Sequence, residues 1–108
     1  MSAVDELVTW LRAALDDDDR NGQHSLNEVL GTRLEHDARF RLAEVEAKRR
    51  ILAMYEDACD RVRNPVSADA RAAARVAQFE LEQVIKALAQ PYAGQPGWRE
   101  EWQLGEDA

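Results

Sequence analysis

The sequence is poor in cysteine, aromatic residues and long apolar runs. Its one cysteine, Cys59, cannot form a disulfide within the chain, and its position on an apolar helical stripe favours a buried, unreactive thiol. No apolar run approaches the roughly 18 residues of a membrane span, and no secretion signal opens the chain. We therefore expect a cytoplasmic protein with no membrane segment. Aromatic residues make up 6% of the chain, which together with abundant alanine predicts a thin core rather than a deep substrate pocket.

Residue patterns typical of metal sites and enzymes are also missing. His24 and His36 stand apart, and neither has a second ligand at metal-binding spacing. The four aspartates at 16–19 lack the alternation and the glycine of a calcium loop, so we interpret them as a solvated, fraying helix end. There is no glycine-rich phosphate loop and no nucleophile with an identifiable base. The sequence therefore predicts a protein that is not an enzyme and that holds no cofactor or metal.

The charge is strongly negative, with a net value of −7 and a pI near 4.8. This balance argues against nucleic acid as a partner, because phosphate contacts need Lys or Arg. Residues 38–63 carry seven bases and five acids and contain the one basic cluster, Lys48, Arg49 and Arg50. We interpret this cluster as a surface of ion pairs in which Arg49 faces the acidic first helix. The alternative is a docking patch for an acidic protein partner.

Apolar residues recur at helical spacing through most of the chain, which predicts an all-α fold. We expect a small helical bundle built on a long antiparallel helical hairpin, with an N-terminal helix and a short C-terminal aromatic segment. The single domain is predicted to contain a helix at 2–20, a connector with a short turn at 23–37, a central helix at 38–63, a helix at 67–90, and a Pro/Trp closing segment with a tail at 91–108.

The first helix is predicted from a Ser2 cap and from an apolar stripe with Trp10 at its flank. Asn21 and Gly22 resemble a left-handed helix end, so the helix is expected to stop at Arg20.

The hairpin is predicted from its end signals. Asp37 is the expected N-cap of the central helix, Asn64 and Pro65 end it, and Ser67 caps the next helix. The apolar stripe of the central helix is broad enough to be covered on two sides, by the first helix and by the following one. Its apolar positions are Phe40, Leu42, Val45, Ile51, Leu52, Met54, Tyr55, Ala58, Cys59 and Val62. The following helix carries an Ala-rich stripe flanked by Val76, Phe79 and Ile85.

Tyr92, Trp98 and Trp102 gather in a segment broken by two prolines. One helical turn after Pro96 would place both tryptophans on one side, with Arg99 facing water. These aromatics either close one end of the bundle or anchor a partner protein. The candidate interaction residues are therefore Tyr92, Trp98, Arg99, Trp102, Lys48, Arg49 and Arg50.

Three blocks of sequence resemble a family of small uncharacterised proteins from actinobacteria and their phages, known as a domain of unknown function. They are DELVTWLR at 5–12, the EVEAKRRIL string at 44–52 that follows His36 and Asp37, and the ending from Pro91 to WREEW at 98–102. The resemblance implies a bacterial or phage-borne cytoplasmic protein and carries no known activity. The sequence departs from the family pattern at Ala38 and Gln95, where proline and histidine are usual.

These observations favour a non-enzymatic protein-interaction module that binds a host or phage protein, and the resemblance is compatible with a phage-encoded chain. The alternatives are a nucleic-acid-associated regulator that uses the basic cluster and a DNA mimic that uses the acidic surface. The broad apolar stripe also leaves room for a homodimer.

Overall fold

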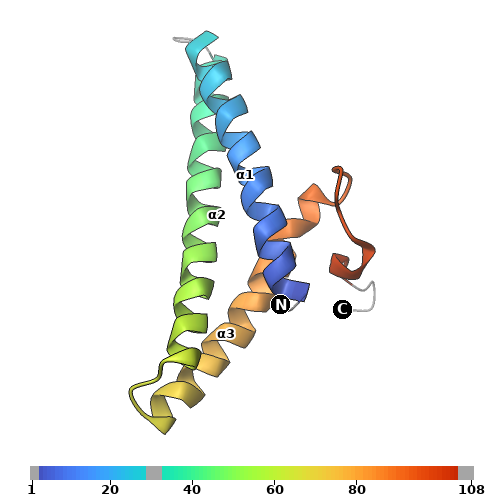
Figure 1. Ribbon diagram of the computed structural model, residues 1–108. Coiled ribbons are helices and arrows are strands. Elements are labelled where there is room, and N and C mark those ends of the chain that lie inside the picture. Colours follow the sequence, from blue (N-terminus) through green and yellow to red (C-terminus); the bar gives the residue numbers. More distant parts are fainter. Residues whose placement is uncertain (1–2, 29–32, 105–108) are drawn as a thin grey trace.

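The computed structural model describes residues 3–28 and 33–104 (Figure 1). Three helices dominate, α1 (Ala3–Glu28), α2 (Arg33–Arg63) and α3 (Ala68–Ala89), and two short 3-10 turns follow, η1 (Gln90–Tyr92) and η2 (Glu100–Trp102). No strand occurs within these ranges. The predicted all-α bundle is confirmed.

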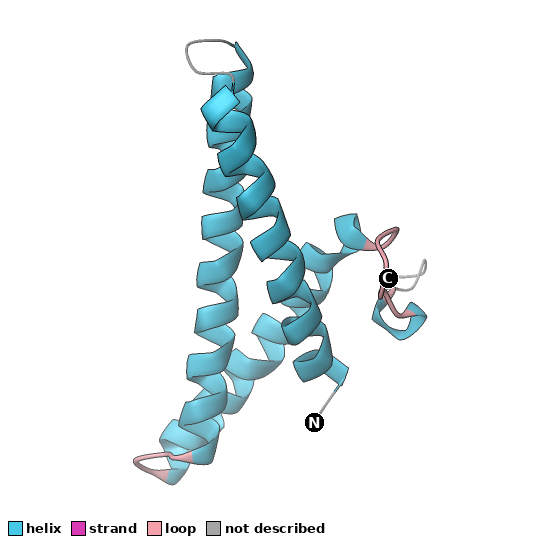
Figure 2. Cartoon of the chain, turned by 45° about the horizontal axis from the view of Figure 1, so that its top comes forward, coloured by secondary structure: helices cyan, strands magenta, loops and turns pink. Residues whose placement is uncertain are grey.

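The helices form an elongated bundle that measures 54 × 31 × 23 Å. α1 lies antiparallel beside α2, while α3 leaves the lower end of α2 and crosses the N-terminal half of α1 (Figure 1). Both α1 and α3 pack against α2, as the broad apolar stripe predicts. Figure 2 shows the C-terminal segment on the side of α1 that faces away from α2.

The predicted end of the first helix at Arg20 is wrong, because α1 continues through Asn21 and Gly22 to Glu28. Gly22 is buried, and a Cβ atom there would lie 2.7 Å from Cδ2 of Leu42 on α2. The glycine therefore permits a close approach of two helices rather than a left-handed turn. The predicted cap Ser2 lies outside the described residues.

The predicted connector at 23–37 is likewise mostly helical. α2 begins at Arg33, so Asp37 lies inside the helix and is not its N-cap. Glu35 in the first turn pairs with Arg39 at 3.1 Å, and Ala38 is buried, so both polar and apolar contacts extend the helix beyond the predicted start. Only residues 29–32 of the connector lie outside the described ranges.

The link between α2 and α3 follows the prediction closely. α2 ends at Arg63, before Asn64 and Pro65. Ser67 is extended, with φ −163° and ψ 168°, and its Oγ accepts a hydrogen bond of 3.0 Å from the amide of Ala70. This N-cap starts α3 one residue after the predicted boundary.

The hydrophobic core lies where α1, α2 and the C-terminal half of α3 meet. Its fully buried side chains include Leu7, Leu11, Leu15, Leu52 and Ile85. Two residues of the predicted central stripe, Phe40 and Met54, are instead exposed. Within the described part of the chain, none of the helices is long and apolar enough to cross a membrane.

Candidate functional site

Four aromatic rings cluster at the C-terminal end of the bundle, around Trp10 of α1. The Trp10 ring centroid lies 5.6 Å from that of Trp98, 5.5 Å from that of Trp102 and 6.4 Å from that of Tyr92. Three of the four ring pairs are edge-to-face, the arrangement that the aromatic quadrupole favours. Sequence reasoning placed Trp10 only at the flank of a helix stripe, and missed it as the centre of this cluster.

The backbone between the two C-terminal tryptophans is not the predicted helical turn. Trp98 lies outside any helix, and Trp102 ends the short turn η2. Gly97 has φ +90°, and a Cβ atom there would lie 2.6 Å from Nε1 of Trp10. The chain thus bends at Gly97 and brings both indoles onto Trp10 from an extended segment. The Trp10 Nε1–H also donates to the carbonyl oxygen of Pro96 at 3.3 Å.

Gln90 ties this segment to the end of α3. Its Nε2 donates to the carbonyl oxygens of Lys86 at 2.8 Å and Trp102 at 2.9 Å, and its Oε1 accepts from the amide of Leu104 at 3.3 Å. Tyr92 and Trp102 are buried, at 5% and 4% exposure, and Trp98 is half-buried. The rings are therefore used within the chain, in line with the first of the two interpretations from the sequence.

Arg99 is exposed at the edge of this cluster. It forms ion pairs with Glu6 of α1 and, at 3.6 Å, with Glu101, and its guanidinium lies 5.4 Å from the ring centroid of Trp102. These contacts fasten the closing segment to the start of α1.

The basic cluster on α2 is also engaged within the chain. Arg49 binds two aspartates of α1, with Nη2 2.6 Å from Asp16 and Nη1 2.8 Å from Asp19. The expectation that Arg49 faces the acidic first helix is confirmed. The hydrogen bond from Arg49 lowers the pKa of Asp19, and the bonds to both aspartates raise the pKa of Arg49.

The two neighbours of Arg49 have acidic partners on their own helix. The Nζ of Lys48 lies 3.8 Å from Glu44, and the Nε of Arg50 lies 3.4 Å from Glu46. Lys48 also lies 3.4 Å from the hydroxyl of Tyr92 and 5.1 Å from its ring centroid. Each of the three bases therefore has an acid beside it.

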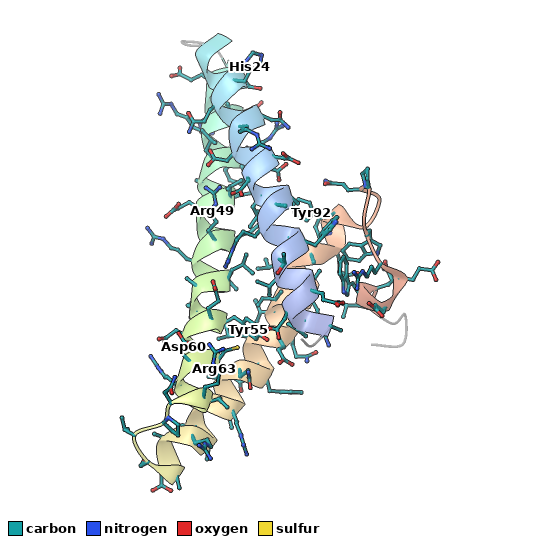
Figure 3. All side chains as sticks on the ribbon, viewed as in Figure 1. His24, Arg49, Tyr55, Asp60, Arg63 and Tyr92 are labelled. Atoms are coloured by element: carbon teal, nitrogen blue, oxygen red, sulfur yellow. The ribbon has the colours of Figure 1, made fainter. Side chains whose placement is uncertain are left out.

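The aspartates at 16–19 are not a fraying helix end, because α1 continues for two more turns beyond them. Successive helical residues point about 100° apart, so the four carboxylates reach different partners. Asp16 and Asp19 bind Arg49, Asp17 pairs with Arg20, and Asp18 accepts a hydrogen bond of 2.8 Å from the Tyr92 hydroxyl. Burial, followed by the bond to Asp18, raises the pKa of Tyr92. Figure 3 shows Arg49 and Tyr92 at a similar height on the bundle.

A cleft of about 300 Å³ opens between the start of α1 and the second half of α2. It is lined by Asp5, Arg12, Tyr55, Cys59 and Arg63, among others. A second cleft, of about 290 Å³, shares Asp5 and Tyr55 and extends to α3. In Figure 3, Tyr55 and Arg63 lie in the lower half of the bundle, where these clefts open.

Most polar groups that line these clefts have a partner within the chain. Arg12 pairs with Glu56 and Arg63 pairs with Asp60, while the Tyr55 hydroxyl donates to Asp5 at 3.2 Å. Burial is the main cause that raises the pKa of Tyr55, so its phenol stays neutral.

Cys59 is half-buried rather than fully buried. Gln78 Nε2 donates to its sulfur at 3.2 Å, and neither Gln78 nor the neutral Tyr55 can act as its base. Across the described residues, no group of three His, Cys, Asp or Glu side chains could hold a metal ion.

The outer face of α3 presents apolar side chains to solvent. Val76 is 60% exposed and Phe79 is 63% exposed, and the nearby alanines at 72, 73 and 87 are exposed as well. The sequence placed Val76 and Phe79 at the flank of a buried stripe. The exposed fractions reveal a second apolar face, opposite the one that packs on α2.

The fold and these sites define a small all-α protein with an internally closed aromatic end and an exposed apolar helix face. The chain belongs to the family of unknown function DUF6221, whose profile matches residues 4–104. The match includes the closing aromatic segment and extends the resemblance of the three blocks to nearly the whole chain. Neither a search of curated proteins nor a search of solved structures found a match.

Proposed function

We propose that this chain is a non-enzymatic protein-interaction module that binds its partner through the outer face of α3. The observation that carries the proposal is the exposure of Phe79, at 63%, beside Val76, at 60%. Large apolar side chains that stay in water on adjacent turns of one helix typically mark a contact surface. A chain with so few aromatic residues places one of them there.

The α3 face supports partner binding better than the C-terminal aromatics do. Tyr92 and Trp102 already bury their rings within the chain, so a partner could use them only by displacing the closing segment. Trp98 and Arg99 stay accessible at the edge of that cluster and would contribute to the rim of an interface at most.

Binding of nucleic acid has less support than binding of protein. Lys48, Arg49 and Arg50 each have a carboxylate within 3.8 Å, which competes with any phosphate for the same cation. We therefore place the partner among proteins. The resemblance to actinobacterial and phage proteins further suggests a cytoplasmic partner encoded by the host or by a phage.

Affinity capture with two matched variants tests the proposal. Immobilised wild type, Phe79→Glu and Phe40→Glu are incubated with lysate from an actinobacterial host, and the bound proteins are identified by mass spectrometry. Phe40 is a suitable control because it is 62% exposed, nearly the same as Phe79, and lies on α2. We expect a partner that the wild type and Phe40→Glu retain and that Phe79→Glu loses. The proposal fails if the three proteins capture the same set.

A further inference from the structure

The exposed face of α3 has the residue spacing of a coiled-coil seam. Asp69, Ala72, Val76, Phe79, Gln83 and Lys86 follow one another at intervals of three and four residues. The first five are exposed and Lys86 is half-exposed. The opposite side of α3 is the one that packs against the rest of the bundle, with Ala74, Ile85 and Ala89 buried. The seam therefore has no covering element in the described part of the chain.

The order of residues along this seam fits a second copy of itself in the antiparallel direction. With the two-fold axis between Val76 and Phe79, Val76 meets Phe79 of the second copy, and Ala72 meets Gln83. At the ends, Asp69 meets Lys86 of the second copy. Antiparallel coiled helices pair residues in this crossed manner, and every contact occurs twice because the interface is symmetric. A parallel copy would instead place Asp69 against Asp69 and Lys86 against Lys86.

The charged residues beside the seam are also complementary when two copies of α3 pair in the antiparallel direction. Arg75 and Glu82 lie on the same edge, one in each half of α3, so an antiparallel copy brings Arg75 opposite Glu82 of its mate. On α1 and α2 most bases, such as Arg12 and Arg49, pair with acids of the same chain. Asp69, Arg75 and Lys86 form no ion pair with any residue that the structure describes, so they remain available to a second molecule.

We infer that the partner of the α3 face is a second copy of this chain, bound with its α3 antiparallel to the first. This inference rests on the proposed function and specifies the partner. The contact spans one helix of 22 residues, with a small apolar centre around Val76 and Phe79. It belongs among the small interfaces, below about 1,200 Å² in total, which are typically weak and reversible.

Sedimentation equilibrium tests the self-association of the full chain. Over roughly 5–500 µM, a range that spans weak dimers, the wild-type mass is expected to rise from 12.2 kDa toward twice that value. Phe79→Glu is expected to weaken dimerisation at least about tenfold, because it buries a charge at the centre of the interface. Phe40→Glu should dimerise as the wild type does, and circular dichroism checks that both variants remain helical.

A charge exchange tests the antiparallel register. Arg75→Glu alone and Glu82→Arg alone each place like charges opposite one another in a homodimer, so each variant should dimerise more weakly than the wild type. An equimolar mixture restores both opposite-charge pairs in the heterodimer and should recover a dimer fraction near that of the wild type. A mixture that dimerises no better than its components overturns the antiparallel pairing.

A wild type that stays at 12.2 kDa up to the highest concentration overturns the self-pairing itself. Equal effects of Phe79→Glu and Phe40→Glu on dimerisation would also overturn the self-pairing. Either result leaves the proposed function standing if a lysate protein is still captured in a manner that depends on Phe79. If no such protein is captured while the dimer forms as expected, the proposed binding of a lysate protein fails and the inferred self-association stands.

Discussion

At the scale of single residues, the chain satisfies its polar and aromatic groups mostly by itself. Trp10 gathers three other rings around it, and Arg49 bridges two aspartates of the neighbouring helix. These side chains close the bundle, whereas Val76 and Phe79 of α3 remain exposed.

Gly97 is the residue on which the closing segment depends most directly. It combines φ +90° with a close approach to Nε1 of Trp10, so Gly97→Ala adds backbone strain and a steric clash. We expect the free energy of unfolding, measured by urea denaturation, to fall by about 1–3 kcal/mol. Gly94 is the matched control, because a Cβ atom there would meet nothing within 4 Å. Gly94→Ala should change stability by less than about 1 kcal/mol, and an equal loss in both variants would contradict the role given to Gly97.

The raised pKa values of the two tyrosines of the chain, Tyr55 and Tyr92, predict that the protein loses stability in alkali. Burial raises the pKa of both above the ordinary value of 10.0, so folding favours their neutral forms. Their contribution is complete below pH 10, where the unfolded phenols are also neutral, and it is lost as the pH rises toward the folded pKa values. Phenolate absorbance should therefore stay low at about pH 11 while the helices are intact, and should then rise as the protein unfolds. Phenolate formation near pH 10 with unchanged circular dichroism would contradict this.

At the scale of elements, apolar spacing was enough to predict three helices, and the end signals at Asn64, Pro65 and Ser67 were enough to predict the link between α2 and α3. The C-terminal end of α1 and the start of α2 could not be predicted from local sequence signals. Asn21 and Gly22 form a valid local stop signal, but the long-range contact of Gly22 with Leu42 overrides it. The closing segment was predicted from its aromatics, whereas the role of Trp10 depends on a bend at Gly97 that no local pattern encodes.

The packing of Gly22 against α2 makes a prediction at this scale. Gly22→Val should force Leu42 out of its position and lower the free energy of unfolding by about 1–3 kcal/mol, even though valine favours the helix more than glycine does. Asn21→Val, at the neighbouring exposed position, provides the control and should be close to neutral. The double variant Gly22→Val/Leu42→Ala should lose less stability than the two single changes added together, because they share one site. Additive losses would mean that Gly22 and Leu42 do not compete for the same space.

At the scale of the whole molecule, the bundle is elongated, and its third helix turns one face inward and one face outward. The inward face was not the predicted alanine stripe, because Ala73 and Val84 of that stripe are exposed whereas Ala74, Ile85 and Ala89 are buried. The outward face could not be predicted either, because Val76 and Phe79 look like core residues until the packing of α3 on α2 fixes which side is buried. Residue spacing was therefore enough to predict the fold class. The candidate interaction surface could be identified only from the arrangement of the helices in space.

Hydroxyl-radical footprinting of the intact chain tests this surface most directly, through the ratio of oxidation at Phe79 to that at Phe40. The two rings are 63% and 62% exposed in the single chain, so their oxidation rates should be equal in dilute protein. With rising protein concentration, or with an added captured partner, oxidation of Phe79 should fall several-fold while that of Phe40 stays constant. If both rings oxidise equally under every condition, or if Phe40 alone becomes protected, the outer face of α3 is not the interaction surface of this protein.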